Sequence, residues 1–193
     1  MNQPNTSNLF FSPIDQALYD ARTIFVNGPV GSELAIKVNS QLLALESADS
    51  TRPIILWINS PGGEVNSGFA IFDMIQFIQS KVITVVAGMA ASMGSVIALA
   101  AEKENRFALT HGKILIHQPL IGGTIHGPAS DIEIHAKNII KTKEHMHKLY
   151  AERTGTSIEK YQELMERDYW VDTDEALELG LISRVICNRK DLE

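Results

Sequence analysis

Residues 53–87 read PIILWINSPGGEVNSGFAIFDMIQFIQSKVITVVA, and this stretch decides the fold class. The almost unbroken apolar run from Pro53 to Ile58 predicts a strand with both faces covered. A turn, Ser60 to Gly63, follows it, and then come a helical pattern from Ser67 to Gln79 and a second apolar run from Val82 to Ala87. Strand, helix and strand in this order predict a parallel βαβ unit.

The same alternation continues on both sides of this unit. Thr23 to Val26 predicts an earlier strand, and Ser32 is placed to cap a helix from Glu33 to about Ala48. Downstream, Ser92 to Glu102 has a helical pattern and Lys113 to His117 predicts another short strand. We therefore expect an α/β fold in which helices pack on both faces of a parallel sheet.

The pattern changes after Pro128. Apolar and charged residues alternate at helical spacing from Ala129 to about Arg153, which predicts one helix about 37 Å long at roughly 1.5 Å per residue. This length exceeds what the core needs, so we expect the helix to project and to pack on another copy of the chain. Thr173 then caps a short helix from Asp174 to Leu179, which Gly180 ends. We interpret residues 1–193 as a single domain with a protruding arm.

Composition and charge exclude several classes of protein. The 193 residues suit one soluble domain, and a net charge of −6 with scattered Lys and Arg argues against a nucleic-acid partner. The single cysteine, Cys187, cannot form an intrachain disulfide, which favours a reducing compartment; its apolar neighbours predict a buried, inert thiol.

Neither the N-terminal segment nor the most apolar window is predicted to direct the chain to a membrane. Residues 1–12 lack the basic region of a secretory signal. The most apolar window, Val82 to Ala101, is interrupted by Gly88, Ser92 and Gly94, so a strand followed by a helix is expected in place of a membrane span. These features predict a cytoplasmic protein without a membrane partner.

A serine surrounded by small residues is the first candidate for chemistry. Ser92 lies in Gly88-Met89-Ala90-Ala91-Ser92-Met93-Gly94, between a buried strand and a helix. A sharp turn there exposes the hydroxyl, small neighbours admit a substrate carbonyl, and the helix start supplies free N–H groups. Ala90 departs from the G-x-S-x-G pattern. The alternative is a serine that only caps the helix, which is the commoner role of such a residue taken alone.

His117 and Asp168 are the other two candidates. His117 ends a predicted strand, where catalytic side chains of α/β sheets gather, although a lone histidine there is more often structural. Asp168 ends the charged run 166–168 before two aromatic residues, and the alternative for this run is a solvated surface. A Ser–His–acid set requires the base to reach the serine hydroxyl and the acid to reach the second ring nitrogen.

Six blocks in the same order carry a resemblance to a known family. They are INSPGG at 58–63, AASMG at 90–94, IHQP at 116–119, DIEIH at 131–135, ERD at 166–168, and EA at 175–176 with GL at 180–181. Over residues 27–185 the chain resembles ClpP, the proteolytic subunit of the Clp protease. The resemblance implies a crotonase-like fold of stacked βαβ units with a protruding long helix and strand, the handle, at residues 120–155. It also implies a serine endopeptidase that cleaves unfolded polypeptides.

The resemblance also implies the role of each residue in the reaction. Ser92 would be the nucleophile, His117 the general base and Asp168 the acid that holds the base. The backbone N–H groups of Gly63 and Met93 would form the oxyanion hole.

A substrate strand and the absence of cofactors are further implications. Gly122 and Gly123 would pair with an extended substrate peptide. Neither a metal nor another cofactor is expected on this chain, and ATP would be used by a partner, since the G-x-x-x-x-G-K-[ST] pattern is absent.

The family's assembly implies partners. Two stacked seven-membered rings, of this chain alone or with a second ClpP-type subunit, would enclose a chamber, with the long helix between the rings and Glu166 and Arg167 at the ring contact. An AAA+ unfoldase such as ClpX, ClpA or ClpC would dock near Ile55, Trp57 and Phe77. Residues 1–20 would form the axial segment.

Departures from the family pattern indicate a diverged paralogue. Ile55 stands where an aromatic residue is usual, Glu166 where Asp is usual, and the loop 121–128 is about two residues longer. His145 and His147 are expected to be solvated, because residues two apart on a helix do not share a face. Two other functions stay open: a non-catalytic ring subunit, and a crotonase acting on acyl-CoA, which CoA binding would reveal.

Overall fold

The computed structural model describes residues 12–124 and 126–192. The strands of this part are β1 Thr23–Asn27, β2 Ile54–Ser60, β3 Val82–Ala91, β4 Arg106–Leu109, β5 Lys113–Ile116, β6 Tyr169–Val171 and β7 Arg184–Ile186. Its helices are α1 Pro13–Asp20, α2 Ser32–Ala48, α3 Val65–Phe77, α4 Met93–Ala98, α5 Ala129–Thr154, α6 Ile158–Leu164 and α7 Thr173–Glu178, with 3-10 turns at Lys103–Asn105 and Arg189–Leu192. The predicted strands and helices that frame Ser92 are thus confirmed, to within a few residues at their ends.

One sheet forms the centre of the molecule. Its main path runs β1-β2-β3-β4-β7 with every pair parallel, as the βαβ prediction requires. β5 pairs in parallel with the far end of β3, and its other edge takes β6 in antiparallel orientation. The strand that leads to Ser92 therefore has β4 beside its first half and β5 beside its second half.

This change of neighbour has a local cause in β3. Ile58 pairs with Val86 but Ser60 pairs with Ala90, so two steps along β2 match four steps along β3. Gly88 takes up the extra residues with a φ of +112°, and a side chain at this position would collide with Asn59. The irregularity redirects the end of β3 toward β5.

Helices cover one face of the sheet. Ile54, Leu56 and Ile58 are buried in the main core, which also contains residues of α2, α3 and α4. Ile55 and Trp57 point to the other face and join a smaller cluster around Ile83, Val85, Phe107 and Ile186. The second face is covered less fully than predicted: α1 and the last 3-10 turn line an apolar groove on it with Ile55 and Trp57.

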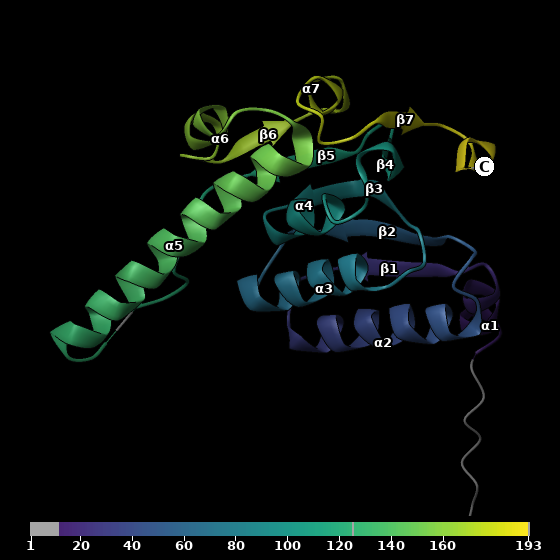
Figure 1. Cartoon of the computed structure of the whole chain (residues 1–193), viewed down its shortest axis with the longest axis horizontal. Helices are drawn as coiled ribbons and strands as arrows, with labels where there is room; N and C mark the ends of the chain where they lie inside the picture. The colour runs from purple at the N-terminus through teal and green to yellow at the C-terminus, as the bar shows by residue number, and fades with distance from the viewer. Residues whose placement is uncertain (1–11, 125, 193) are drawn as a thin grey trace, which may run out of the picture.

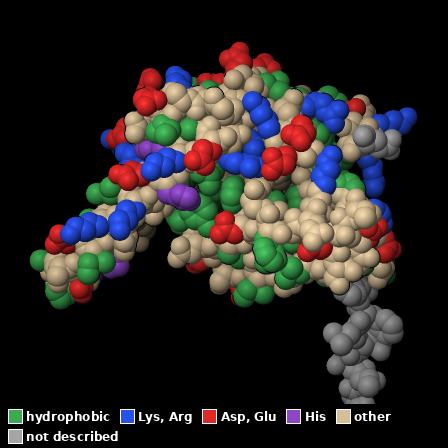
Figure 2. Space-filling view, viewed as in Figure 1, with side chains coloured by type: hydrophobic (Ala, Val, Ile, Leu, Met, Phe, Trp, Pro, Cys, Tyr) green, Lys and Arg blue, Asp and Glu red, His purple; other side chains and the backbone are tan. Residues whose placement is uncertain are grey.

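α5 projects from the body as the predicted arm (Figure 1). Its C-terminal half is anchored by buried Met146, His147, Leu149 and Tyr150, whereas Ile132, Ile134 and Ile140 are exposed. Figure 2 shows charged and apolar side chains mixed along it. The strand predicted beside the helix in the handle is wrong for residues 120–124, which are irregular.

Several local predictions need correction. Gly31 caps α2 and Ser32 is its first residue, while Asp172, one residue before Thr173, caps α7 by accepting two backbone N–H groups. Cys187 is exposed, because the chain leaves the sheet after Ile186.

Of His145 and His147 in α5, His145 is exposed as expected, whereas His147 is not. His147 is 3% exposed and so is not solvated, and His145 packs against the ring of Phe69. The residues of the predicted axial segment are described only from 12 onward; Ser12 and Asp15 form a capping box at the start of α1, and residues 1–11 lie outside the described range.

Candidate active site

The chain turns sharply at Ser92, between β3 and α4. The residue has φ +53° and ψ −120°, a conformation that costs a non-glycine residue about 1–3 kcal/mol. Its N–H donates to the carbonyl of Leu115 in β5, at 2.9 Å, which holds the turn in place. Although Ser92 occupies the N-cap position of α4, its side chain makes no capping hydrogen bond. The alternative of a purely capping serine is therefore wrong.

The antiparallel pairing of β5 with β6 brings the other two candidates together. Ile116 pairs with Tyr169, so His117 and Asp168 are the next residues outward on adjacent strands. His117 Nε2 lies 2.8 Å from Ser92 Oγ, and His117 Nδ1 lies 3.3 Å from Asp168 Oδ1. The imidazole is largely buried, with 15% of its side chain exposed, whereas the Asp168 carboxylate is 70% exposed.

Two glycines after β2 pass directly against this turn. A Cβ atom on Gly62 would lie 2.6 Å from Ser92 Cβ and 3.0 Å from the nitrogen of Met93. A Cβ on Gly63 would lie 2.1 Å from the carbonyl oxygen of Val30, which pairs with Gly63 as an isolated bridge. Side chains at either position are thus excluded by contact. Ser60 fixes the loop by donating to the Gly28 carbonyl and accepting from Gly62 N–H.

The N–H groups predicted to bind an oxyanion come from these two segments. Met93 is the first residue of α4, where backbone N–H groups have no partner within the helix. Within residues 12–124 and 126–192, neither the Met93 N–H nor the Gly63 N–H donates to a backbone or side-chain acceptor outside a helix or strand. Both donors are available to a ligand beside Ser92.

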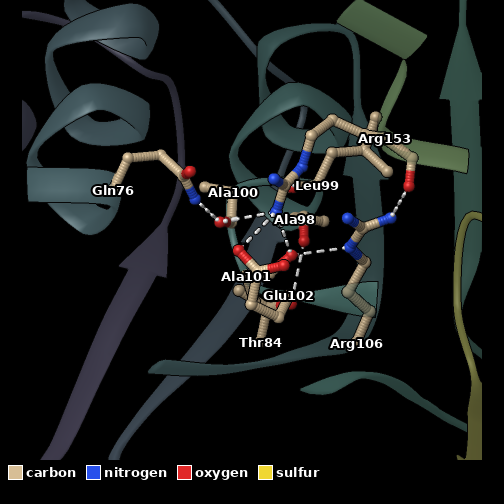
Figure 3. Close-up of polar contacts among 9 residues, drawn as sticks. All are labelled: Gln76, Thr84, Ala98, Leu99, Ala100, Ala101, Glu102, Arg106 and Arg153. Carbon is tan, nitrogen blue, oxygen red and sulfur yellow. Dashed lines mark hydrogen bonds and ion pairs between the residues drawn. The ribbon is translucent and has the colours of Figure 1, made fainter. Parts of the chain in front are cut away.

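The other end of α4 is held by two arginines (Figure 3). The guanidinium of Arg153, from the last turn of α5, donates to the carbonyls of Leu99, Ala100 and Ala101 at 2.7–3.2 Å. Arg106 donates to Ala101 and to the Arg153 carbonyl, and its burial lowers the pKa of its guanidinium to about 10. These bonds satisfy the carbonyls that follow a six-residue helix and fix its position on α5 and β4.

The described residues form neither a metal site nor a membrane span. The described residues contain no group of three His, Cys, Asp or Glu side chains that could hold a metal ion. In the same part of the chain, no helix is long and apolar enough to cross a bilayer.

Comparison with known proteins decides the family. Residues 7–189 match the family model described as Clp protease. The chain belongs to the Clp protease family. It is 46% identical over 179 residues, 93% of each chain, to the ATP-dependent Clp protease proteolytic subunit 1 of Chlamydia muridarum. It is also 46% identical over 177 residues, 92% of this chain and 88% of the other, to proteolytic subunit 2 of Treponema denticola.

Family membership settles the class of the protein. The chain is a proteolytic subunit of the serine endopeptidase type, as its sequence blocks predicted, and a crotonase acting on acyl-CoA is no longer an alternative. This class uses no cofactor of its own. The relatives include both first and second proteolytic subunits, so the comparison leaves the paralogue open.

The residues predicted to bind the unfoldase and the substrate lie in different parts of the fold. Ile55 and Trp57 line one apolar groove with α1 and the C-terminal turn, but Phe77 lies outside it and is 79% exposed. Gly122 and Gly123 are exposed on the irregular segment after Pro119.

The predicted ring-contact residues lie next to the triad. Glu166 pairs at 2.9 Å with Lys143 of α5, which lowers the pKa of its carboxyl, and Arg167 is exposed beside Asp168. Sequence reasoning missed Ser95 and Tyr150, which are bonded behind the turn; a serine and a tyrosine at buried helix positions carry no signal of this contact.

Proposed function

We propose that Ser92, His117 and Asp168 hydrolyse peptide bonds as a catalytic triad. The observation that carries this proposal is the 2.8 Å contact between Ser92 Oγ and His117 Nε2, made by a serine in a strained turn that leaves its helix uncapped. A strained backbone and an unused capping position both cost stability, so a role for the hydroxyl elsewhere accounts for them.

The reaction follows from the positions of the three side chains. As Ser92 Oγ attacks the scissile carbonyl, its proton passes to His117 Nε2, and the carbonyl oxygen becomes an oxyanion that accepts from the N–H groups of Gly63 and Met93. The C–N bond then breaks and the leaving amine takes the proton from His117. Water attacks the resulting ester, gives a proton to His117, and the acid is released as Ser92 regains its proton. Asp168 accepts from Nδ1 and stabilises the imidazolium.

We further propose the assembly and substrates that the family pattern implies. Copies of this chain, alone or with a second proteolytic subunit, form two stacked heptameric rings, with the exposed isoleucines of α5 buried between them. The names of the relatives include ATP dependence, which supports a partner AAA+ unfoldase such as ClpX, ClpA or ClpC that delivers unfolded polypeptides. The apolar groove at Ile55 and Trp57 suits its docking. A single, free cysteine suits the cytoplasm.

A non-catalytic subunit is the remaining alternative, and a covalent probe separates the two. The intact mass of the chain is measured after reaction with a fluorophosphonate, alone and with the organism's second proteolytic subunit. We expect one adduct on the wild type and none on Ser92→Ala. Ser95→Ala serves as a control that keeps Ser92, and it should still acquire the adduct. Absence of an adduct on the wild type in both assemblies would refute the catalytic function.

A further inference from the structure

A chain of hydroxyl groups lies behind the catalytic turn. Ser95 Oγ lies 2.6 Å from the Ser92 carbonyl oxygen, 3.2 Å from the Leu115 carbonyl oxygen and 2.5 Å from the hydroxyl of Tyr150. Ser95 is 1% exposed and Tyr150 is fully buried, so water does not compete for these bonds. These hydrogen-bonded hydroxyls connect three elements: α4, which follows Ser92, β5, which precedes His117, and the arm α5.

The direction of the hydrogen bonds follows from the number of protons. Ser95 has one hydroxyl proton, and the Ser92 carbonyl is the nearer of its two acceptors. Only if Tyr150 donates to Ser95 do both hydroxyl protons find an acceptor among the described residues, so Tyr150 donates. Burial raises the pKa of the Tyr150 phenol, which keeps this donor protonated at every working pH. The order is Tyr150 O–H to Ser95 Oγ, and Ser95 O–H to the Ser92 carbonyl.

The end of this chain is the peptide group of the oxyanion hole. The Ser92 carbonyl and the Met93 N–H belong to one planar peptide unit, in which C=O and N–H point in opposite directions. The carbonyl also accepts from the backbone N–H groups of Ser95 and Val96, at 2.9 and 3.3 Å. A donor at the carbonyl fixes the plane of the unit and, through cooperative polarisation, makes its N–H a stronger donor.

We propose that Tyr150 and Ser95 are positioning residues that aim and polarise the Met93 N–H toward the oxyanion. The inference rests on the proposed function, because it concerns the same transition state. A serine that bonds back to the preceding turn of its own helix is common, and that contact alone would carry no such role. What distinguishes this one is the tyrosine from another element, 55 residues away, whose hydroxyl bonds to that serine.

A kinetic comparison in the assembly that reacts with the fluorophosphonate tests the proposal. Tyr150→Phe and Ser95→Ala should each lower kcat for a short fluorogenic peptide about three- to tenfold, less than loss of a whole oxyanion donor, with KM unchanged because the interaction belongs to the transition state. The double variant should equal Ser95→Ala, since both changes break one chain. Ser95→Ala, which only removes an oxygen, decides the test if Tyr150→Phe fails to fold.

Tyr161→Phe is the matched control. Its ring packs 5.2 Å from that of Tyr150, it is equally buried, and its hydroxyl makes no contact with Ser95. It should keep the wild-type kcat. An unchanged kcat for Ser95→Ala in a wild-type background that labels would overturn the inference and leave the proposed function intact, and so would additive losses in the double variant. A wild type that never labels refutes the proposed function, and the inference with it.

Discussion

The contact between the glycine loop and the catalytic turn makes a sharp prediction for Gly62→Ala. The new methyl group would lie 2.6 Å from both the Ala91 carbonyl oxygen and Ser92 Cβ, where ordinary contact begins at 3.4 Å. The loop and the turn must therefore separate by about 0.8 Å, as estimated from the shortest packing distances. The two proposed oxyanion donors lie on opposite sides of this contact, so the same movement pulls them apart.

The loss of stability expected for Gly62→Ala has a conformational and a steric part. Alanine at the positive φ of Gly62, +87°, costs roughly 1–2 kcal/mol, and the crowded contact adds about 1–3 kcal/mol. For catalysis, a displacement near 1 Å at the reacting groups lowers the rate by about 10²-fold. We expect kcat for a short fluorogenic peptide to fall by that factor, while the protein remains folded.

Gly155→Ala separates the conformational cost from the steric cost. Gly155 ends α5 with φ +84°, almost the value of Gly62, but nothing lies within 4 Å of its added Cβ. The free energy of unfolding of this variant should fall by the conformational cost alone, and its activity should equal that of the wild type. Stability is measured by urea denaturation and activity by peptide cleavage, side by side. If Gly62→Ala were as active as Gly155→Ala, the glycine loop would not bear on the reacting groups and the assigned oxyanion hole would be wrong.

Three further variants test other parts of the site. Asp168→Asn should lower kcat by about 10²-fold or more without a change in the urea midpoint, because an exposed amide no longer stabilises the imidazolium. Arg153→Met should cost about 1–3 kcal/mol in urea unfolding, because it leaves the Leu99 carbonyl unpaired while Ala100 and Ala101 keep their bonds to Gln76 and Arg106. The exposed Lys148→Met should cost almost nothing. Burial lowers the pKa of the His147 imidazole. Below about pH 6.5 the unfolded chain therefore binds more protons than the folded chain, and the free energy of unfolding should fall from pH 7.5 to 5.5. His147→Phe should flatten this dependence of stability on pH, and the exposed His135→Phe should not.

The elements that sequence reasoning found share long patterns. The strand from Ile54, the helix α3 and the arm extend over enough residues for their periodicity to show, and the blocks around Ser92 and His117 carried the family. β4, β6 and β7 were missed, since three or four residues are too few to establish a period; β5 is as short and was nevertheless predicted. The sequence also does not show which of two adjacent residues caps α7. Asp172 does so in place of Thr173 because its carboxylate accepts from two backbone N–H groups.

The incomplete cover of the second face of the sheet could not be predicted, for a different reason. Every residue from Ile54 to Ile58 is apolar, so alternation between faces leaves no trace in the sequence. The structure separates them, with Leu56 in the core and Trp57 only half-buried beside an open groove. A strand with two apolar faces therefore indicates that both are covered in the working protein, and here the second cover is expected from another chain.

The three side chains that meet at Ser92 were named from the sequence, but the cause of their meeting was not. That cause is a register change between β2 and β3, within the quoted blocks at 58–63 and 88–94. Two extra residues in β3 around Gly88 turn its end away from β4 and onto β5. Only this pairing brings the carbonyl of Leu115 to the N–H of Ser92, and it places Ser92 within reach of the histidine two residues beyond Leu115. β6 adds Asp168 to the other edge of the same short strand. Ser92, His117 and Asp168 thus converge because β5 is a shared neighbour, and so the geometry depends on backbone pairing as much as on the three side chains.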